Sequence, residues 1–341
     1  MRETAGILLL MICLILTSCS TAEDNQNKTV KTKPLVVIIT DVGGIGDASF
    51  NDAVLSSVEK VQKDEEFDTR FLEARNITDY DYVLKEALGL QPKIIIAVGS
   101  NMAKSVEVAA KANPKMNYGI VDAAVKFDNV KSLQFADNES AFLAGFIAAS
   151  KTKTGTIGFV GGEDRETVSL FFEGYAAGAK VAKPDVKIQR DFVGSFYDPK
   201  TAEKVTDSLV RSTKADVVMH LAGPSGVGVI KSAKKNSIWA IGADKDQSKL
   251  ASQTVLCSAI KEMDGGISKM IKSALKDKYD GEILFYDMKD EGVDISDNAG
   301  NTDSETMNKV EKLKKAIKDG KIKVPKTQEE RMKFKMPDGI L

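Results

Sequence analysis

The chain has 341 residues, with 48 lysines and arginines against 49 aspartates and glutamates and a formal net charge of −1. A balanced charge excludes the clustered Lys and Arg surface of nucleic-acid-binding proteins, so we expect no nucleic-acid partner. One histidine and three cysteines argue against His-rich metal sites, Ser-His-Asp catalysis and a disulfide framework, and we expect no metal and no cofactor.

The chain begins with an apolar run, Ala5–Leu16, which contains twelve residues. As a helix this run rises about 18 Å, which is too short to cross a membrane and is typical of a signal-peptide core. The next residues, Leu16-Thr17-Ser18-Cys19, resemble the lipobox of bacterial lipoproteins. That resemblance implies cleavage after residue 18 and a lipid on Cys19, whereas the alternative is an ordinary signal peptide with an incidental cysteine.

The segment Ser20–Pro34 contains one aliphatic side chain larger than alanine, Val30. Such a segment cannot bury itself, so residues 19–34 are predicted to be a lipidated N-terminus and flexible tether. Cys13 would leave with the leader, so Cys257 would be the free thiol of the mature protein. An anchor on a bacterial membrane predicts a location in the cell envelope, either periplasmic or surface-exposed.

Apolar runs bounded by Gly, Pro, Asp or Asn recur along the rest of the chain, and amphipathic stretches of helical length separate them. One series is Leu35–Thr40, Thr69–Glu73, Lys93–Val98, Tyr118–Val121 and Ser132–Phe135. A second is Thr156–Val160, Val186–Gly194, Asp216–Leu221, Ile238–Gly242 and Val255–Ile260. Continuous β-branched runs that alternate with helices indicate parallel sheets covered on both faces. We therefore predict an α/β fold with two doubly wound lobes.

The late segments, including Ile283–Met288, are expected to complete the lobes by crossing back. The N-terminal lobe is predicted to contain residues 35–137 and about 262–285. The C-terminal lobe would contain residues 138–261 and about 286–341. Several crossings of this kind predict a multi-strand hinge in place of a single linker.

Polar and aromatic residues gather just after the predicted strands, where open α/β sheets bind ligands. These segments are 41–51, 99–101, 121–123, 194–197, 222–228 and 242–247. Because both lobes supply them, we expect a cleft between the lobes.

Several motifs have a structural explanation. Gly44–Ser49 approximates a dinucleotide-binding fingerprint, but Ser49 replaces the third glycine and Asp47 would repel a pyrophosphate. Asp47 or Ser49 could instead cap a helix at Phe50–Gln62. His220 and Cys257 lie in buried strand patterns and are expected to be core residues.

The motifs DVGGIGDASFN, FLAGFIAAS, GFVGG, FFEGYAAGAK, GSFYDP, AGPSGVGVIKSAK, AIGADKDQ and VLCSAIKEMD, in this order, resemble those of the basic membrane protein family. The family consists of substrate-binding lipoproteins of ABC importers, including purine nucleoside receptors, and the resemblance covers about residues 35–290. It implies a type I periplasmic-binding-protein fold. It also implies that the protein is not an enzyme. It also implies an importer permease and ATPase as partners, and we expect a monomer.

The resemblance also implies ligand contacts. Phe50 and Phe196 would stack on the two faces of a purine, and Asp244 would accept hydrogen bonds from the ribose hydroxyls. Lys261 would contact the ligand or hold Asp244 or Asp122 in place.

Four further contacts are implied: Asp41 in the first binding loop, Asn51 at a base edge, Asp122 after its strand, and Gly223 through close backbone approach. Gly46 and Ala48 depart from the family pattern, because relatives often carry a carboxylate pair there. The base preference among guanosine, inosine and adenosine therefore stays open.

Three other functions remain as alternatives. A sugar receptor of the same fold would need more polar pocket residues. A surface adhesin for host macromolecules would use exposed lysines, so its binding would weaken steeply with salt. A nucleoside-cleaving enzyme would release a free base.

Overall fold

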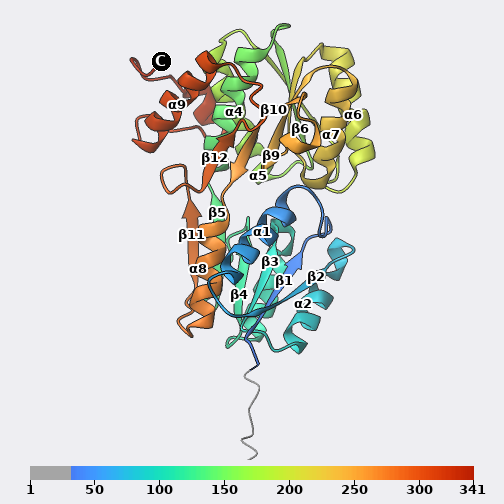
Figure 1. Cartoon of the computed structure of the whole chain (residues 1–341), viewed down its shortest axis with the longest axis vertical. Helices are drawn as coiled ribbons and strands as arrows, with labels where there is room; N and C mark the ends of the chain where they lie inside the picture. Colours follow the sequence, from blue (N-terminus) through green and yellow to red (C-terminus); the bar gives the residue numbers. More distant parts are fainter. Residues whose placement is uncertain (1–31) are drawn as a thin grey trace, which may run out of the picture. The chain divides into compact units, whose positions relative to one another are not determined.

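The N-terminal sheet is fully parallel, with the strand order β11-β5-β4-β3-β1-β2 (Figure 1). Its strands are β1 (Leu35–Thr40), β2 (Asp68–Glu73), β3 (Ile94–Val98), β4 (Asn117–Val121), β5 (Val130–Phe135) and β11 (Glu282–Tyr286). Every residue of β3 is buried, because this strand lies between β1 and β4 and is covered on both faces. The run of three isoleucines in β3 therefore has no solvent-facing side.

The helices of this first lobe pack in two pairs. Helix α1 (Phe50–Gln62) contacts α8 (Asp264–Leu275), and α2 (Tyr80–Gly89) contacts α3 (Ala103–Ala112). Short 3₁₀ turns, η1 (Ile77–Asp79) and η2 (Ser100–Met102), precede α2 and α3.

The second sheet has the order β12-β10-β9-β8-β6-β7, and only β12 runs antiparallel to its neighbour. Its strands are β6 (Thr156–Gly161), β7 (Lys187–Phe192), β8 (Val217–Leu221), β9 (Trp239–Asp244), β10 (Val255–Lys261) and β12 (Val293–Ser296). Its helices are α4 (Asp137–Lys151), α5 (Glu166–Ala182), α6 (Pro199–Thr213), α7 (Gly226–Lys235), α9 (Ser304–Lys318) and α10 (Gln328–Lys333), with turns η3 (Gly223–Ser225) and η4 (Ser248–Leu250). Together with the first sheet, these elements confirm the predicted α/β fold of two doubly wound sheets.

The chain crosses between the two sheets at three places. It leaves β5 for α4, returns from β10 to α8, and leaves β11 for β12. Strands β5 and β11 are neighbours in one sheet, and β10 and β12 are neighbours in the other. The three crossings therefore lie side by side and form a hinge of several segments.

The computed structural model describes residues 32–341, and residues 33–341 form one compact unit with its own core. The predicted leader and Cys19 lie outside the described residues. Within residues 32–341, no helix combines the length and the apolar character that a membrane crossing requires.

Helices α4 and α5 approach so closely that only glycine fits at their contact. A Cβ atom on Gly178 would lie 1.8 Å from the carbonyl oxygen of Phe142, and one on Gly145 would lie 1.9 Å from that of Tyr175. These distances are far below van der Waals contact, so a larger residue must push the two helices apart.

We expect the substitution Gly178→Ala to lower the free energy of unfolding by about 3 kcal/mol, because it overpacks the α4–α5 contact. Thermal and urea unfolding of residues 33–341 measure this effect. Gly89→Ala is the matched control: this helical glycine has no atom within 4 Å of its added Cβ. The free energy of unfolding of the Gly89→Ala variant should rise by about 0.4–1 kcal/mol. Equal stability of the two variants would contradict the packing argument.

Candidate functional site

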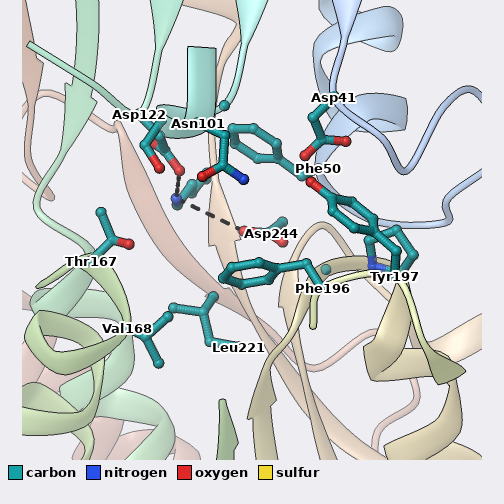
Figure 2. A pocket seen from close by; sticks show the side chains of 15 residues that line it. Asp41, Phe50, Asn101, Asp122, Thr167, Val168, Phe196, Tyr197, Leu221 and Asp244 are labelled. Carbon is teal, nitrogen blue, oxygen red and sulfur yellow. Dashed lines mark hydrogen bonds and ion pairs between the residues drawn. The ribbon is translucent and has the colours of Figure 1, made fainter. Parts of the chain in front are cut away.

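A cavity of about 80 Å³ lies between the carboxyl ends of the two sheets. Figure 2 shows its side chains converging from both lobes. The residues that line it are Asp41, Phe50, Gly99, Ser100, Asn101, Asp122, Thr167, Val168, Phe196, Tyr197, Leu221, Gly223, Pro224, Asp244 and Lys261.

Strand ends supply most of this lining. In the first lobe, Asp41 follows β1, residues 99–101 follow β3, and Asp122 follows β4. In the second lobe, Asp244 ends β9 and Lys261 ends β10. Parallel strands bring their carboxyl ends to one edge of a sheet, which explains why residues so distant in sequence meet here.

Seven of the eight ligand-contacting residues expected from the sequence line the cavity. They are Asp41, Phe50, Asp122, Phe196, Gly223, Asp244 and Lys261. The lining also includes residues that the sequence did not single out as ligand contacts, namely Asn101, Thr167, Val168 and Leu221. Thr167 and Val168 belong to the first turn of α5. Their residue types are common at the start of any helix, so the sequence does not indicate that they line a cavity.

Asn51 is the exception, because it does not line the cavity where a contact with a base edge was expected. Its side-chain Nδ2 donates to Asp41 Oδ1 at 2.7 Å and to Asp47 Oδ2 at 3.1 Å. Its Oδ1 accepts from the Asp41 backbone N–H at 3.3 Å. Asn51 is buried and does not line the cavity, so it holds Asp41 in place.

Asp47 caps the helix that begins at Phe50. The sequence had left Asp47 and Ser49 as alternatives for this cap. Its carboxylate accepts from the backbone N–H groups of Ser49 at 2.9 Å, Asn51 at 2.9 Å and Asp52 at 3.1 Å. Ser49 does not cap the helix with its side chain. Its hydroxyl instead donates to Asp244 Oδ2 at 2.8 Å, which is a contact between the two lobes.

Two phenylalanine rings enter the cavity from opposite lobes. Phe50 begins α1 and Phe196 follows β7, and Figure 2 shows their rings on different sides of the space. The Phe196 ring packs against Gly162, where an added Cβ would lie 2.3 Å from the ring carbon Cδ1. The glycine therefore fixes the position of Phe196.

A buried lysine lies among three carboxylates at one end of the cavity. Lys261 Nζ is 2.6 Å from Asp122 Oδ2, 3.3 Å from Asp137 Oδ2 and 3.9 Å from Asp244 Oδ1. Burial acts to lower the pKa of Lys261, but the three carboxylates outweigh it and raise that pKa above its usual value. The ammonium is therefore charged throughout the physiological range.

One ammonium cannot neutralise three carboxylates, of which Asp137 and Asp244 are buried and Asp122 is partly exposed. Burial raises the pKa of Asp137 to about 7, a rise that Lys261 opposes and that the charges of Asp122 and Asp244 reinforce. Burial also raises the pKa of Asp244. Asp137 was not foreseen as part of the site, because an aspartate at the start of a helix is usually explained as a helix-terminal charge.

The opposite end of the cavity is also polar. Asp41 accepts from Asn51 and from the Gly43 backbone N–H at 2.9 Å, but burial still raises its pKa. In Figure 2 the Tyr197 hydroxyl points toward the Asp41 carboxylate. Burial, followed by the charge of Asp41, raises the pKa of Tyr197, so this hydroxyl stays protonated and can donate.

The arrangement suits binding. His220 does not line the cavity, and among residues 32–341 no cluster of three or more His, Cys, Asp or Glu side chains could hold a metal ion. The cavity combines two flat apolar surfaces with polar groups at both ends. This arrangement favours a flat ligand with hydrogen-bonding groups at its edges.

A family model described as "ABC transporter substrate-binding protein PnrA-like" matches residues 35–328. The ABC transporter nucleoside-binding protein BmpA of Lactococcus lactis is 37% identical over 320 residues, which cover 87% of this chain and 90% of the relative. Basic membrane protein A of Borreliella burgdorferi is 32% identical over 337 residues, which cover 96% and 97% of the two chains.

A crystal structure of an ABC transporter solute-binding protein from Aeropyrum pernix has the same fold. The TM-score is 0.78 at 24% identity, and the match covers 88% of this chain and 96% of that one. At this level of identity the likeness supports the fold alone.

The charge excess around Lys261 predicts a pH effect on stability. Because the folded-state pKa of Asp137 is raised to about 7 from 3.8, the folded protein keeps a proton that the unfolded chain has lost. Wild-type stability should therefore fall, relative to Asp137→Asn, as the pH rises from about 4 to about 7. Urea unfolding at both pH values should show a change of at least about 1.4 kcal/mol in this difference, the equivalent of one pKa unit. A difference that does not vary with pH would refute the charge excess at Asp137.

Proposed function

Because the chain belongs to the family of PnrA-like substrate-binding proteins of ABC transporters, we propose that its substrate is a purine nucleoside. The chain is a binding protein and not an enzyme, as expected from the sequence, and it works outside the cytoplasm with a permease and an ATPase as partners. The observation that carries the nucleoside proposal is the pair of rings, Phe50 and Phe196, on the two sides of one cavity.

The purine base would lie between the two rings. Stacking of a base on an aromatic side chain is worth about 1–3 kcal/mol, and two faces can each make such a contact. Because one ring comes from each lobe, both contacts form together only when the lobes are closed. A ligand that binds the closed form more tightly shifts the protein toward closure.

The ribose would lie at the end of the cavity that holds Asp244 and Lys261. An ionised carboxylate only accepts hydrogen bonds, so Asp244 suits the donor hydroxyls of a vicinal diol. One oxygen of Asp244 accepts from Ser49 across the lobes, so closure itself fixes the orientation of this carboxylate. Lys261 and Asp122, joined by a 2.6 Å ion pair, would complete the contact with the sugar.

The base edge would face Asp41, Asn101 and Tyr197 at the other polar end, and Gly223 would allow close approach of the backbone. Asp41 supplies acceptors and Tyr197 supplies a hydroxyl donor. The candidate ligands are guanosine, inosine and adenosine. The name of the Lactococcus lactis relative, a nucleoside-binding protein, supports this class of ligand.

The proposed receptor is anchored through a lipid on Cys19, which the lipobox-like sequence supports. Two or more acyl chains hold a protein firmly on a membrane. The segment before Lys33 would then act as a tether from which the binding unit delivers nucleoside to the importer.

Titration calorimetry on residues 33–341, after any retained ligand is removed by unfolding and refolding, tests the proposal. We expect guanosine, inosine or adenosine to bind and free ribose not to bind, and chromatography should recover the nucleoside intact. Binding of a sugar or an amino acid, with no heat from any purine nucleoside, would disprove it.

The substitution Phe196→Ala should weaken nucleoside binding by at least about tenfold, or about 1.4 kcal/mol, because it removes one stacking surface. Phe285→Ala is the matched control, since Phe285 is half exposed on strand β11 and does not line the cavity. Equal affinities of the two folded variants would remove Phe196 from the proposed site.

The substitution Asp244→Ala should also weaken nucleoside binding by at least about tenfold. If Asp244 contacts the ribose, its loss should affect a nucleoside much more than the corresponding free base. Calorimetry with inosine and hypoxanthine makes this comparison. A similar loss for both ligands would assign Asp244 to the base or to the fold.

A further inference from the structure

Two loops that flank the cavity are joined to each other by hydrogen bonds between the lobes. The Ala48 carbonyl accepts from Gln247 Nε2 at 3.1 Å, and one residue further on the Ser49 hydroxyl donates to Asp244 Oδ2 at 2.8 Å. Neither Ala48 nor Gln247 lines the cavity. The first of these bonds therefore joins the lobes without contacting the space where a ligand would lie.

The orientation of the Gln247 side chain is fixed from behind. Its Oε1 accepts from the Ala243 backbone N–H at 3.1 Å and lies 2.8 Å from His220 Nε2. A rotated amide would turn its NH₂ group toward the Ala243 N–H, which is a donor, and would lose that bond. Gln247 is buried, so no water replaces the lost partner and the Nε2 group must point toward Ala48.

His220 is held in the protonation state that this arrangement needs. Because Oε1 of a glutamine can only accept, Nε2 of His220 carries the hydrogen. Nδ1 has no hydrogen-bond partner among residues 32–341, and burial lowers the pKa of His220 to about 4, so the ring is neutral at physiological pH. Gly226 lies against the ring, where an added Cβ would be 2.1 Å from Cε1. Helix α7 therefore holds the ring in place.

The bond from Gln247 is accepted by a residue of the first loop that has a strained backbone and lies next to Ser49 and Phe50. Ala48 has φ +54°, a left-handed conformation that alanine rarely adopts. Its carbonyl belongs to the peptide that leads into Ser49 and Phe50. Fixing this peptide sets the direction of the Ser49 hydroxyl toward Asp244 and the start of the helix that carries Phe50.

We propose that His220 and Gln247 form a clasp that holds the two ligand-binding loops together when the lobes are closed. Gln247 is a positioning residue in this clasp: it acts through Ala48, and it prolongs the time for which the closed protein retains its substrate. The proposal rests on the proposed function only in naming a nucleoside as that substrate.

The clasp has a definite kinetic consequence. In an open protein, Gln247 Nε2 and the Ala48 carbonyl would both bind water, and closure exchanges these bonds for one between the lobes. The bond forms whenever the lobes close, with or without ligand, so its loss destabilises the closed form and should act on bound ligand mainly through the dissociation rate.

The test uses residues 33–341 with the substitutions Gln247→Glu and Gln247→Ala. Gln247→Glu keeps an acceptor for His220 and Ala243 but replaces the donor to Ala48 with a second acceptor. We expect stopped-flow release of nucleoside to be about tenfold faster in both variants, with little change in the association rate. Ser248→Ala is the matched control, because the Ser248 hydroxyl donates to Asp246 within the same loop. Release at the wild-type rate from both Gln247 variants would overturn the clasp.

A second readout needs no ligand. Spin labels on the exposed positions Val108 and Lys231, one in each lobe, report the distance between lobes by pulsed electron resonance. Gln247→Glu should shift ligand-free protein toward longer distances than wild type, and Ser248→Ala should not. If no nucleoside binds at all, the proposed function fails, whereas this measurement still decides for or against the clasp: identical distance distributions overturn it.

The role of His220 is tested by a double-mutant cycle. His220→Leu should accelerate release by itself, because it frees the Gln247 amide to rotate. It should add nothing in the Gln247→Glu background, where the donor to Ala48 is already lost. Fully additive effects on release would overturn the link between the two residues. If His220→Leu fails to fold, the Gln247 variants decide the proposal alone.

Discussion

The ion pairs of Lys261 are the interaction on which the arrangement of the lobes depends most. Lys261 ends β10, immediately before the chain crosses to α8, and Asp137 begins α4, immediately after the chain crosses from β5. Asp122 and Asp244 come from the strand ends of different lobes. A single buried ammonium at one hinge crossing thus contacts a carboxylate at a second crossing and one carboxylate from each lobe of the cavity. Removing it would leave the buried carboxyl groups of Asp137 and Asp244 and the partly exposed Asp122 without a counter-ion, which costs more than losing a surface pair.

The same cluster sets the chemical character of the site. Its carboxylates outnumber its ammonium, so the cavity end around Asp244 attracts neutral hydrogen-bond donors and repels anions. A sugar diol satisfies this requirement, whereas a phosphate group would not. At the other end, Asp41 is held by Asn51 and the capped first loop, so this polar end is built within one lobe.

Much of the fold could be predicted from the sequence because it depends on continuous apolar strands. The runs at β1, β3 and β8 are buried on both faces, and their pattern needs no tertiary information. The ends of the strands depend on pairing that the local pattern does not show. Strand β10 continues one residue past the predicted run, through Lys261, because pairing with β12 extends it. His220 is a buried, hydrogen-bonded core residue, as predicted.

The site could be predicted only in part, for a physical reason. Strand ends reveal which residues reach the cavity edge, but they do not reveal which partners those residues meet. Asn51 looked like a base contact because it is polar beside Phe50, yet two neighbouring carboxylates occupy its amide. The partners of Lys261 and Gln247 lie up to 199 residues away, where local pattern carries no information.

The three crossings have a mechanical consequence. Two of them, between β5 and α4 and between β10 and α8, contain only one or two residues, and the third spans residues 287–292. Three short segments that run side by side resist twisting and sliding of one lobe against the other, and they allow bending across the hinge. Helix α4, which follows one of these crossings, packs closely against α5 within the second lobe. We expect motion between the lobes to be mainly one rotation about these crossings, which would bring the rings of Phe50 and Phe196 to a similar relative position each time the lobes close.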